Sequence, residues 1–295
     1  MGKNITGKTQ LCGVIGDPIT HTMSPAMHNA AFEHTGLDFC YVPFLVKKEE
    51  LPQAVAGMRA FNMRGLNVTM PHKVAIIPLL DEIDDLAGKI GAVNTVVNND
   101  GVLRGYNFDA AGFIKALTEN GVEPEDKMVT IVGAGGAGRS VAFALAERGV
   151  RMTILNRRLE INWAEELAHN LTETYHYEVK ALELSDSNLA GVLKETDILV
   201  NTTSVGMTPD INETPVAASH LKSSLVVFDA VYHPVKTRLL REAEQTGARV
   251  ISGLEMLVWQ GTLGFELWTG VEAPAELMRE EVIRQLTGDE NSKSP

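Results

Sequence analysis

A glycine-rich run joins a short apolar segment, residues 128–132, to a helical pattern, residues 139–149. The run reads Gly133, Ala134, Gly135, Gly136, Ala137 and Gly138, and it matches G-x-G-x-x-G in the strand-turn-helix context that this pattern requires. Glycines let the backbone turn tightly and approach a pyrophosphate, whose charge is met by free N–H groups and by the helix dipole. The run therefore predicts a dinucleotide site, and a glycine-rich turn without a ligand is the alternative.

Three polar residues, Asn156, Arg157 and Arg158, follow the next predicted strand, residues 152–155. At this place NAD-specific folds carry an acidic residue that binds the ribose 2′-hydroxyl. Two guanidinium groups can instead bind a 2′-phosphate in a bidentate manner, and no carboxylate occurs before Glu160. The pattern favours NADP over NAD as the cofactor, and a solvated pair of surface arginines is the alternative.

A lysine lies where a helix is expected to begin. After the predicted strand at 65–68, polar side chains follow and Pro71 starts a helix that has Lys73 in its first turn. A positive charge at that point opposes the helix dipole, which disfavours the ammonium form as a proton-transferring lysine requires. A surface lysine without a chemical role is the alternative.

Asp109 precedes a helical segment, residues 110–120, and its position suits an N-cap. A carboxylate beside Lys73 would also orient the lysine and relay protons. Its charge would favour the ammonium form and partly cancel the effect of the dipole. We expect the two groups to titrate as a coupled unit if they meet.

Two hydroxyl groups, those of Thr22 and Ser24, stand just before Pro25 at the start of another predicted helix. Ser24 is well placed as the N-cap of that helix. The two hydroxyls could instead hold a carboxylate at the helix N-terminus, and their spacing is compatible with both interpretations.

Several function classes are disfavoured. The eight histidines show no metal-ligand spacing, and no G-x-S-x-G motif is present, so neither a metal nor a hydrolase is predicted. Cys12 and Cys40 are too few for a disulfide framework. The net charge of −12 opposes binding to nucleic acid or anionic membranes. We expect a cytoplasmic protein, because no signal peptide and no span of about 20 apolar residues is visible.

The order of the predicted elements indicates an α/β fold with two domains. Strands and helices alternate from the N-terminus, interrupted by a hairpin at Asp100-Gly101, and alternate again from 128 to 251 as in a Rossmann-type sheet. The run at 253–270 is apolar nearly all round, so we expect a buried helix that packs on the first domain.

We therefore predict a discontinuous N-terminal α/β substrate domain with a mostly parallel sheet, a Rossmann-type nucleotide-binding domain, and an active-site cleft between them. Residues 1–110 and 252–288 are assigned to the first domain, 111–251 to the second, and 289–295 to a loose tail.

Nine motifs in the same order resemble the shikimate dehydrogenase family across almost the whole chain. They are GDPITHTMSPAMHN, NVTMPHK, GAVNTVV, GYNFDAAG, GAGGAG, NRR, NTTSVGM, DAVYHP and GLEMLVWQG. The resemblance implies a reversible, NADPH-dependent reduction of 3-dehydroshikimate to shikimate, a step of aromatic amino-acid biosynthesis on the way to chorismate. The expected partner is this small-molecule substrate or quinate, and we expect the protein to be a monomer or a homodimer.

The resemblance assigns roles residue by residue. The catalytic pair is Lys73 and Asp109. Together with that pair, the substrate contacts implied are Thr22, Ser24, Thr69, Asn94, Tyr232 and Gln260. The cofactor contacts implied are the 133–138 run, Asn156, Arg157, Arg158, Thr202, Ser204, Val205, Met207, Gly253 and Met256.

Two positions depart from the family pattern. Thr22 stands where serine is usual, and Arg158 stands where strict NADP enzymes usually have threonine. Asn-Arg-Arg resembles the quinate/shikimate dehydrogenase branch, which also uses NAD, although Leu159 replaces the aspartate often found there. A quinate/shikimate dehydrogenase using NAD or NADP is therefore the alternative function, and a nucleotide-sensing regulator without turnover is a more remote one.

Overall fold

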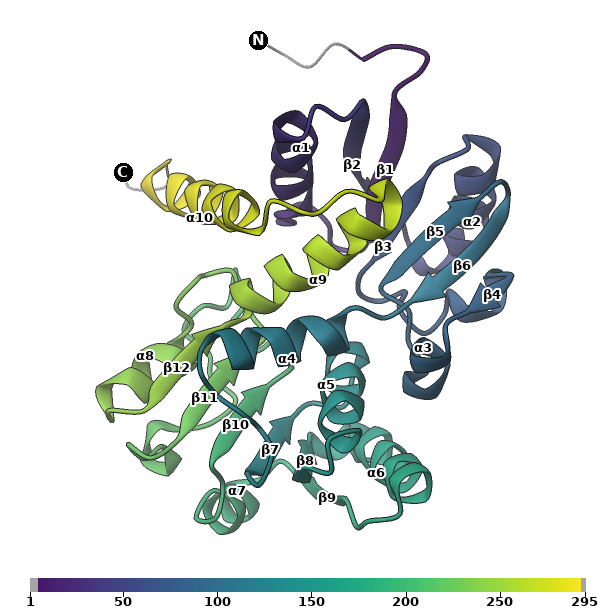
Figure 1. Ribbon diagram of the computed structural model, residues 1–295. Coiled ribbons are helices and arrows are strands. Elements are labelled where there is room, and N and C mark those ends of the chain that lie inside the picture. Colours follow the sequence, from purple (N-terminus) through teal and green to yellow (C-terminus); the bar gives the residue numbers. More distant parts are fainter. Residues whose placement is uncertain (1–4, 293–295) are drawn as a thin grey trace. The chain divides into compact units, whose positions relative to one another are not determined.

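The computed structural model describes residues 5–292, and for 289–292 it describes the backbone alone (Figure 1). The chain forms two compact units. The first unit is built from the residues up to Phe108 and from Val258 onward, and the second unit is Asp109–Leu257. The boundaries placed from sequence, after residues 110 and 251, lie a few residues from these.

The second unit contains a parallel sheet of the doubly wound type, as the sequence predicted. Its strand order is β12-β11-β10-β7-β8-β9, and every neighbouring pair is parallel. The strands are short apolar runs because helices cover both faces of such a sheet. The order reverses between β7 and β10, which is where ligands bind in sheets of this type. The strands are β7 (Met128–Val132), β8 (Arg151–Asn156), β9 (Lys180–Glu183), β10 (Ile198–Asn201), β11 (Val226–Asp229) and β12 (Arg249–Ser252).

Helices alternate with these strands (Figure 1). Three of them, α4, α5 and α6, pack side by side. Leu189 of α7 and Leu239 of α8 contribute to an apolar core with Leu199 and Val227 of the sheet. The helices of the second unit are α4 (Asp109–Glu119), α5 (Gly136–Ala146), α6 (Ile161–Tyr175), α7 (Asp186–Val192) and α8 (Arg238–Gln245), with single 3₁₀ turns at η3 (Arg158–Glu160) and η4 (Ala218–His220).

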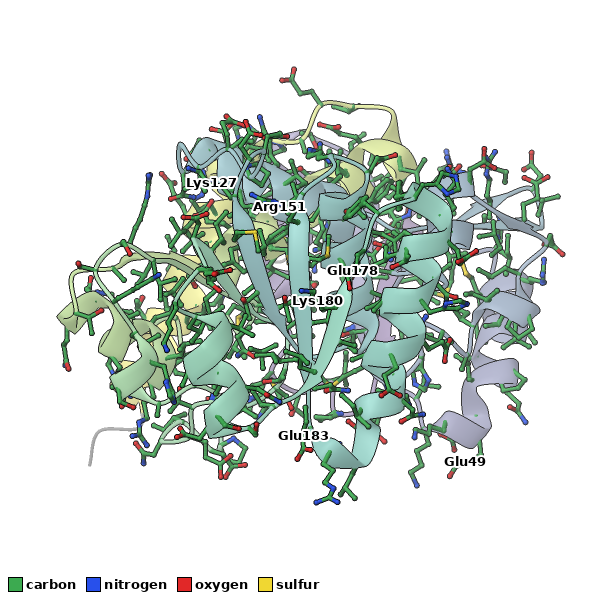
Figure 2. The ribbon with its side chains drawn as sticks, turned by 90° about the horizontal axis from the view of Figure 1, so that it is seen from below. Glu49, Lys127, Arg151, Glu178, Lys180 and Glu183 are labelled. Atoms are coloured by element: carbon green, nitrogen blue, oxygen red, sulfur yellow. The ribbon has the colours of Figure 1, made fainter. Side chains whose placement is uncertain are left out.

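The edge strand β9 carries charge at both ends. Figure 2 labels Lys180 where the strand begins and Glu183 where it ends; Glu183 pairs with Asn156, at the end of β8 opposite to Arg151. Charged side chains on an edge strand oppose pairing with a strand of another molecule.

The first unit contains a mixed sheet with the order β2-β1-β3-β5-β6-β4. Strand β1 is parallel to β2 and β3, and β4 is parallel to β6, whereas β5 is antiparallel to β3 and β6. The predicted hairpin is confirmed, since Asp100 and Gly101 between β5 and β6 have φ of 52° and 94°. The strands are β1 (Gln10–Gly16), β2 (Phe39–Leu45), β3 (Gly65–Val68), β4 (Glu82–Ile83), β5 (Thr95–Asn99) and β6 (Val102–Tyr106).

The apolar C-terminal run forms helix α9 (Gly253–Thr269), and its burial confirms the prediction. Trp268 is 2% exposed and donates a hydrogen bond from Nε1 to the Val96 carbonyl oxygen, at 3.1 Å. In the described part of the chain, no helix combines the length and apolar character needed to cross a membrane. The other helices of the first unit are α1 (Ser24–His34), α2 (Leu51–Ala60), α3 (Asp85–Ile90) and α10 (Ala275–Ser292), with 3₁₀ turns at η1 (Lys48–Glu50) and η2 (Ile77–Leu79).

Two terminal assignments were wrong. Ser24 is the first residue of α1 and Met23 holds the N-cap position, where no side chain caps the helix. The Ser24 hydroxyl thus lies one residue too far along the helix for the predicted N-cap role. Residues 289–292, assigned to the loose tail, continue helix α10, while 293–295 lie outside the described residues.

The helix predicted to begin at Pro71 does not form. Residues 71–76 make turns that lead into the 3₁₀ turn η2. The Lys73 carbonyl accepts its hydrogen bond from the Val93 N–H, at 2.7 Å, rather than from a residue one turn later. Pro78 lacks the N–H that a continuing helix would need. Lys73 therefore does not lie in the first turn of an α-helix, so the expected helix dipole that would disfavour its charge has no source.

We expect Gly65→Ala to destabilise the first unit, because a Cβ at this position of β3 would overlap the Trp268 indole. Overpacking of this kind costs about 1–3 kcal/mol of unfolding free energy, which urea denaturation would measure. Gly88→Ala is the matched control, since its Cβ would lie 3.8 Å from Ile83 and alanine favours helix. A Gly65→Ala protein as stable as wild type would contradict the packing described here.

Candidate active site and cofactor site

In the first unit, the candidate residues gather where parallel strands end. Ile15 of β1 pairs with Val68 of β3, so the loops that follow both strands leave from the same sheet edge. The two loops are in contact, because the Asp17 N–H donates to the Met70 carbonyl oxygen, at 3.0 Å. Thr69 lies in the second of these loops, against Gly16, the last residue of β1. The edge therefore brings together two segments that are about fifty residues apart, as expected of parallel strands.

Thr22 and Ser24 lie at the start of α1, beyond the first loop. The Ser24 N–H donates to the Thr22 hydroxyl oxygen, at 3.4 Å, and Ser24 itself is buried. A hydroxyl group that accepts this bond keeps its own hydrogen for another acceptor. The pair can thus present O–H donors, which suits a carboxylate.

Lys73, Asn94 and Gln260 come together in the same unit. The bond from the Val93 N–H to the Lys73 carbonyl places Lys73 beside the segment that carries Asn94. The Asn94 side-chain nitrogen faces the Gln260 side-chain oxygen of α9, at 3.4 Å. Two amides from distant sequence positions thus meet, and the backbone of Lys73 lies beside the residue that precedes one of them.

Asp109 is the first residue of α4 and belongs to the second unit, where it is 6% exposed. It directly follows Phe108, whose N–H donates to the side-chain oxygen of Asn94, at 2.8 Å. Chain connectivity therefore ties Asp109 to a residue that is bonded to Asn94.

The glycine-rich run in the second unit has the conformation that a dinucleotide site needs. Gly133 has φ of 105°, which favours glycine, and a Cβ on Gly138 would overlap the Gly133 carbonyl oxygen. A Cβ on Gly135 would meet open space, so the backbone there is free to be approached. Helix α5 begins at Gly136. These residues fit a pyrophosphate at a helix N-terminus, with separate glycines for the turn and for close packing.

Arg157 and Arg158 differ in their surroundings. Arg157 donates from Nε and from a terminal nitrogen to the Glu160 carboxylate, at 2.6 and 2.5 Å, and this pairing holds the pKa of Glu160 below its usual value. Asn156 donates to the Glu160 carbonyl oxygen, at 2.6 Å, which holds the turn η3 in place. Arg158 is exposed, and no side-chain ion pair or hydrogen bond is recorded for it among the described residues.

The segment after β10 is held against the glycine-rich run. The Thr202 hydroxyl donates to the carbonyl oxygens of Val132 and Gly133, at 3.0 and 3.1 Å. Ser204 is exposed, whereas Val205 and Met207 are partly buried. Thr202 thus has a structural partner, and the residues after it follow a strand next to the order reversal of the sheet.

The remaining predicted residues have packing roles of their own. A Cβ on Gly253 would overlap the backbone of Ala230, which explains why glycine stands there. Met256 is buried in α9 and Tyr232 is partly exposed. Among the described residues, no group of three or more His, Cys, Asp or Glu is arranged to hold a metal ion.

Sequence reasoning missed several buried polar residues that support the candidate sites. Thr95, Tyr41 and Asn67 stand behind Asn94, and Asp229 stands behind Asn201. The motifs offered the only signal. Asn67, Thr95 and Asp229 lie inside NVTMPHK, GAVNTVV and DAVYHP, whereas Tyr41 lies in none of the nine, because hydrogen-bond partners on other strands are invisible in a sequence.

Comparisons with known proteins agree along most of the chain. Three family models match: the shikimate dehydrogenase substrate binding domain at 14–96, the shikimate / quinate 5-dehydrogenase at 116–236, and the shikimate 5′-dehydrogenase C-terminal domain at 253–283. A curated protein of Dehalococcoides mccartyi, named shikimate dehydrogenase (NADP(+)), is 46% identical over 96% of this chain and 98% of its own. The chain belongs to the shikimate dehydrogenase family.

Solved structures of this family have the same fold. A shikimate dehydrogenase in complex with NADP+ has a TM-score of 0.91 and 42% identity, covering 97% of this chain and 99% of its own. A shikimate 5-dehydrogenase of Listeria monocytogenes, in complex with shikimate and NAD, has a TM-score of 0.87 and 41% identity, covering 95% and 98%. Likeness at this level extends over both units.

Asp229, at the end of β11, is a buried carboxyl whose titration should make the stability of the second unit depend on pH. It is 0% exposed and accepts hydrogen bonds from Asn201, Thr237 and the Val231 N–H. Burial raises its pKa from 3.8 to about 6, and the hydrogen bonds limit that rise. A raised folded-state pKa means that the stabilising contribution is complete below the unfolded pKa and is lost as pH rises through the folded pKa.

We expect the unfolding free energy of wild type, relative to Asp229→Asn, to fall between about pH 4 and about pH 7, by about 3 kcal/mol. Asparagine has no charge to bury, so the variant lacks this titration. Urea denaturation of both proteins at several pH values would measure the difference. A difference that is constant across this pH range would show that Asp229 titrates like an exposed carboxyl.

Proposed function

We propose that this chain is a shikimate dehydrogenase that reversibly reduces 3-dehydroshikimate to shikimate with NADPH. The observation that supports it most is the contact between Asn94 and Gln260, with the Lys73 backbone bonded to Val93, in a chain 46% identical, over 96% of its length, to an enzyme of that name. We include a cytoplasmic location in the proposal, because an NADPH-dependent biosynthetic enzyme needs a compartment in which NADPH is kept reduced.

The proposed chemistry divides between cofactor and chain. The bound NADPH supplies the hydride to the ketone carbon, so the chain has to place the substrate and move one proton. Lys73 donates that proton from Nζ to the developing alkoxide and takes it back in the oxidation. Asp109 orients the Lys73 ammonium. An acid-base group of this kind typically contributes about 10²- to 10⁴-fold to the rate.

The hydroxyl and amide donors of the first unit support a placement of the substrate. Thr22 and Ser24 hold the carboxylate, while Thr69, Asn94 and Gln260 bind the ring hydroxyls, and Tyr232 completes the substrate contacts. The cofactor is held by the 133–138 run at its pyrophosphate and by Asn156, Arg157 and Arg158 at its adenosine 2′-phosphate. Ser204, Val205, Met207, Gly253 and Met256 are proposed to line its remaining contacts, with Thr202 holding the loop.

We expect Lys73→Ala to lower kcat by about 10²- to 10⁴-fold, because the variant lacks the proposed proton donor to the alkoxide. Affinity for shikimate, measured by calorimetry without turnover, should change far less. Lys89→Ala, which alters an exposed lysine of α3, is the control and should retain full activity. A kcat within a few-fold of wild type would rule out the acid-base role of Lys73.

A matrix of assays with shikimate or quinate and with NADP+ or NAD+ tests the specificity. We expect kcat/KM to be highest for shikimate with NADP+, by about 10- to 100-fold over NAD+, since charge-assisted hydrogen bonds are worth about 1.5–3 kcal/mol. Equal values for both acids and both cofactors would favour the quinate/shikimate alternative. A protein that binds NADP+ without any turnover would favour the nucleotide-sensing regulator.

Direct binding gives the same prediction an independent readout. Arg158→Ala should weaken the binding of adenosine 2′,5′-bisphosphate and leave the binding of adenosine 5′-monophosphate unchanged, because only the first ligand carries the 2′-phosphate. Arg151→Ala, at the opposite end of β8, is the matched control. Equal weakening of both nucleotides would show that Arg158 does not act on the 2′-phosphate.

A further inference from the structure

A chain of buried polar side chains lies behind Asn94 in the first unit. The Tyr41 hydroxyl donates to the Asn67 side-chain oxygen, at 2.6 Å, and the Asn67 nitrogen donates to the Thr95 hydroxyl, at 3.1 Å. The Thr95 hydroxyl donates in turn to the Asn94 side-chain oxygen, at 3.0 Å. These four residues are between 0% and 6% exposed. Buried polar groups are costly unless they are paired, so each link constrains the next.

The orientation of the Asn94 amide follows from its donors. The Phe108 backbone N–H, 2.8 Å from Asn94 Oδ1, can only donate, which identifies that atom as the oxygen. Thr95 has a single hydroxyl hydrogen, and because its oxygen accepts from Asn67, that hydrogen goes to the same Oδ1. Two donors thus hold the oxygen, and the nitrogen Nδ2 is left on the side that faces Gln260.

Strand geometry places Thr95 for this task. Thr95 of β5 is the cross-strand partner of Asn67 of β3, so the two side chains meet directly. Thr95 is 0% exposed and lies one residue beyond Asn94, which excludes it from direct contact with a ligand at the surface. Its hydroxyl can act on the site only through Asn94.

We propose that Thr95 is a positioning residue that locks the Asn94 amide with its nitrogen toward the substrate, and this inference rests on the proposed function. An N–H donor can bind a substrate oxygen whether that oxygen belongs to a hydroxyl or to a ketone. A flipped amide would present Oδ1, which can accept from a hydroxyl but would repel a ketone oxygen. The lock therefore suits a site that must hold both the alcohol and the ketone form.

Thr95→Val tests the proposal, because valine keeps the shape of the side chain and removes the hydroxyl. We expect the dissociation constant and the KM for shikimate to rise about tenfold, the typical effect of one lost hydrogen bond, with the KM for NADP+ within about twofold of wild type. Thr95→Ser, which retains the hydroxyl, should restore shikimate binding. Calorimetry with shikimate alone separates binding from turnover.

Thr130→Val is the matched control for stability. Thr130 of β7 is 1% exposed and shares a hydrogen bond with Thr196, at 2.7 Å, in the second unit. It should lose stability to a similar degree without a change in shikimate affinity. Tyr41→Phe removes only the first hydrogen bond of the buried polar series and should weaken shikimate binding about twofold. It provides a second variant if Thr95→Val folds poorly.

A double-mutant cycle decides whether Thr95 acts through Asn94. In an Asn94→Ala background, Thr95→Val should have no further effect on shikimate affinity, since the amide that it orients is gone. Additive effects, wild-type affinity in Thr95→Val, or equal losses in Thr95→Val and Thr95→Ser would each overturn the positioning role. A wild-type protein that does not bind shikimate would overturn the proposed function, and the inference with it.

Discussion

The hydrogen bond from the Phe108 N–H to the Asn94 side chain is the contact on which the first unit's candidate site depends. It identifies the orientation of Asn94, whose amide faces Gln260 on one side and Thr95 on the other. It also anchors the chain one residue before Asp109, where the second unit begins. One backbone donor therefore holds the polar cluster of the first unit at the end of that unit's first segment.

The polar groups behind this contact are costly to bury, and the structure pairs them along one path. Tyr41, Asn67 and Thr95 satisfy one another between β2, β3 and β5. Such a network restricts each amide to one orientation, because a flip leaves buried donors facing donors. The side-chain oxygen of Asn94 is thus held from behind by residues that are between 0% and 6% exposed.

The second unit uses glycine and one buried carboxylate for a similar purpose. Gly133 and Gly138 allow the run after β7 to turn and pack, and Thr202 bonds to the carbonyl groups of that turn. Asp229 holds Asn201 at the end of β10, although burial raises the pKa of its carboxyl to about 6. Glu160, in turn, holds Arg157 but leaves Arg158 outside the pair. The positive charge of Arg157 is therefore balanced by a neighbouring carboxylate, whereas Glu160 does not pair with the adjacent Arg158.

Sequence alone determined what depends on local pattern. The parallel sheet around the 133–138 run, the hairpin at Asp100-Gly101 and the buried C-terminal helix follow from periodicity, glycine chemistry and apolar content, and the motifs indicated the family. The helix predicted from Pro71 and Lys73 was wrong. The Lys73 carbonyl accepts its hydrogen bond from the Val93 N–H and not from a residue one helical turn later. The N-cap position predicted at Ser24 was also wrong by one residue, because Met23 holds it. Only the tertiary structure decided that Asn94 meets Gln260, that Thr95 stands behind it and that Arg157 is paired, since these contacts depend on where separate strands and turns end in space.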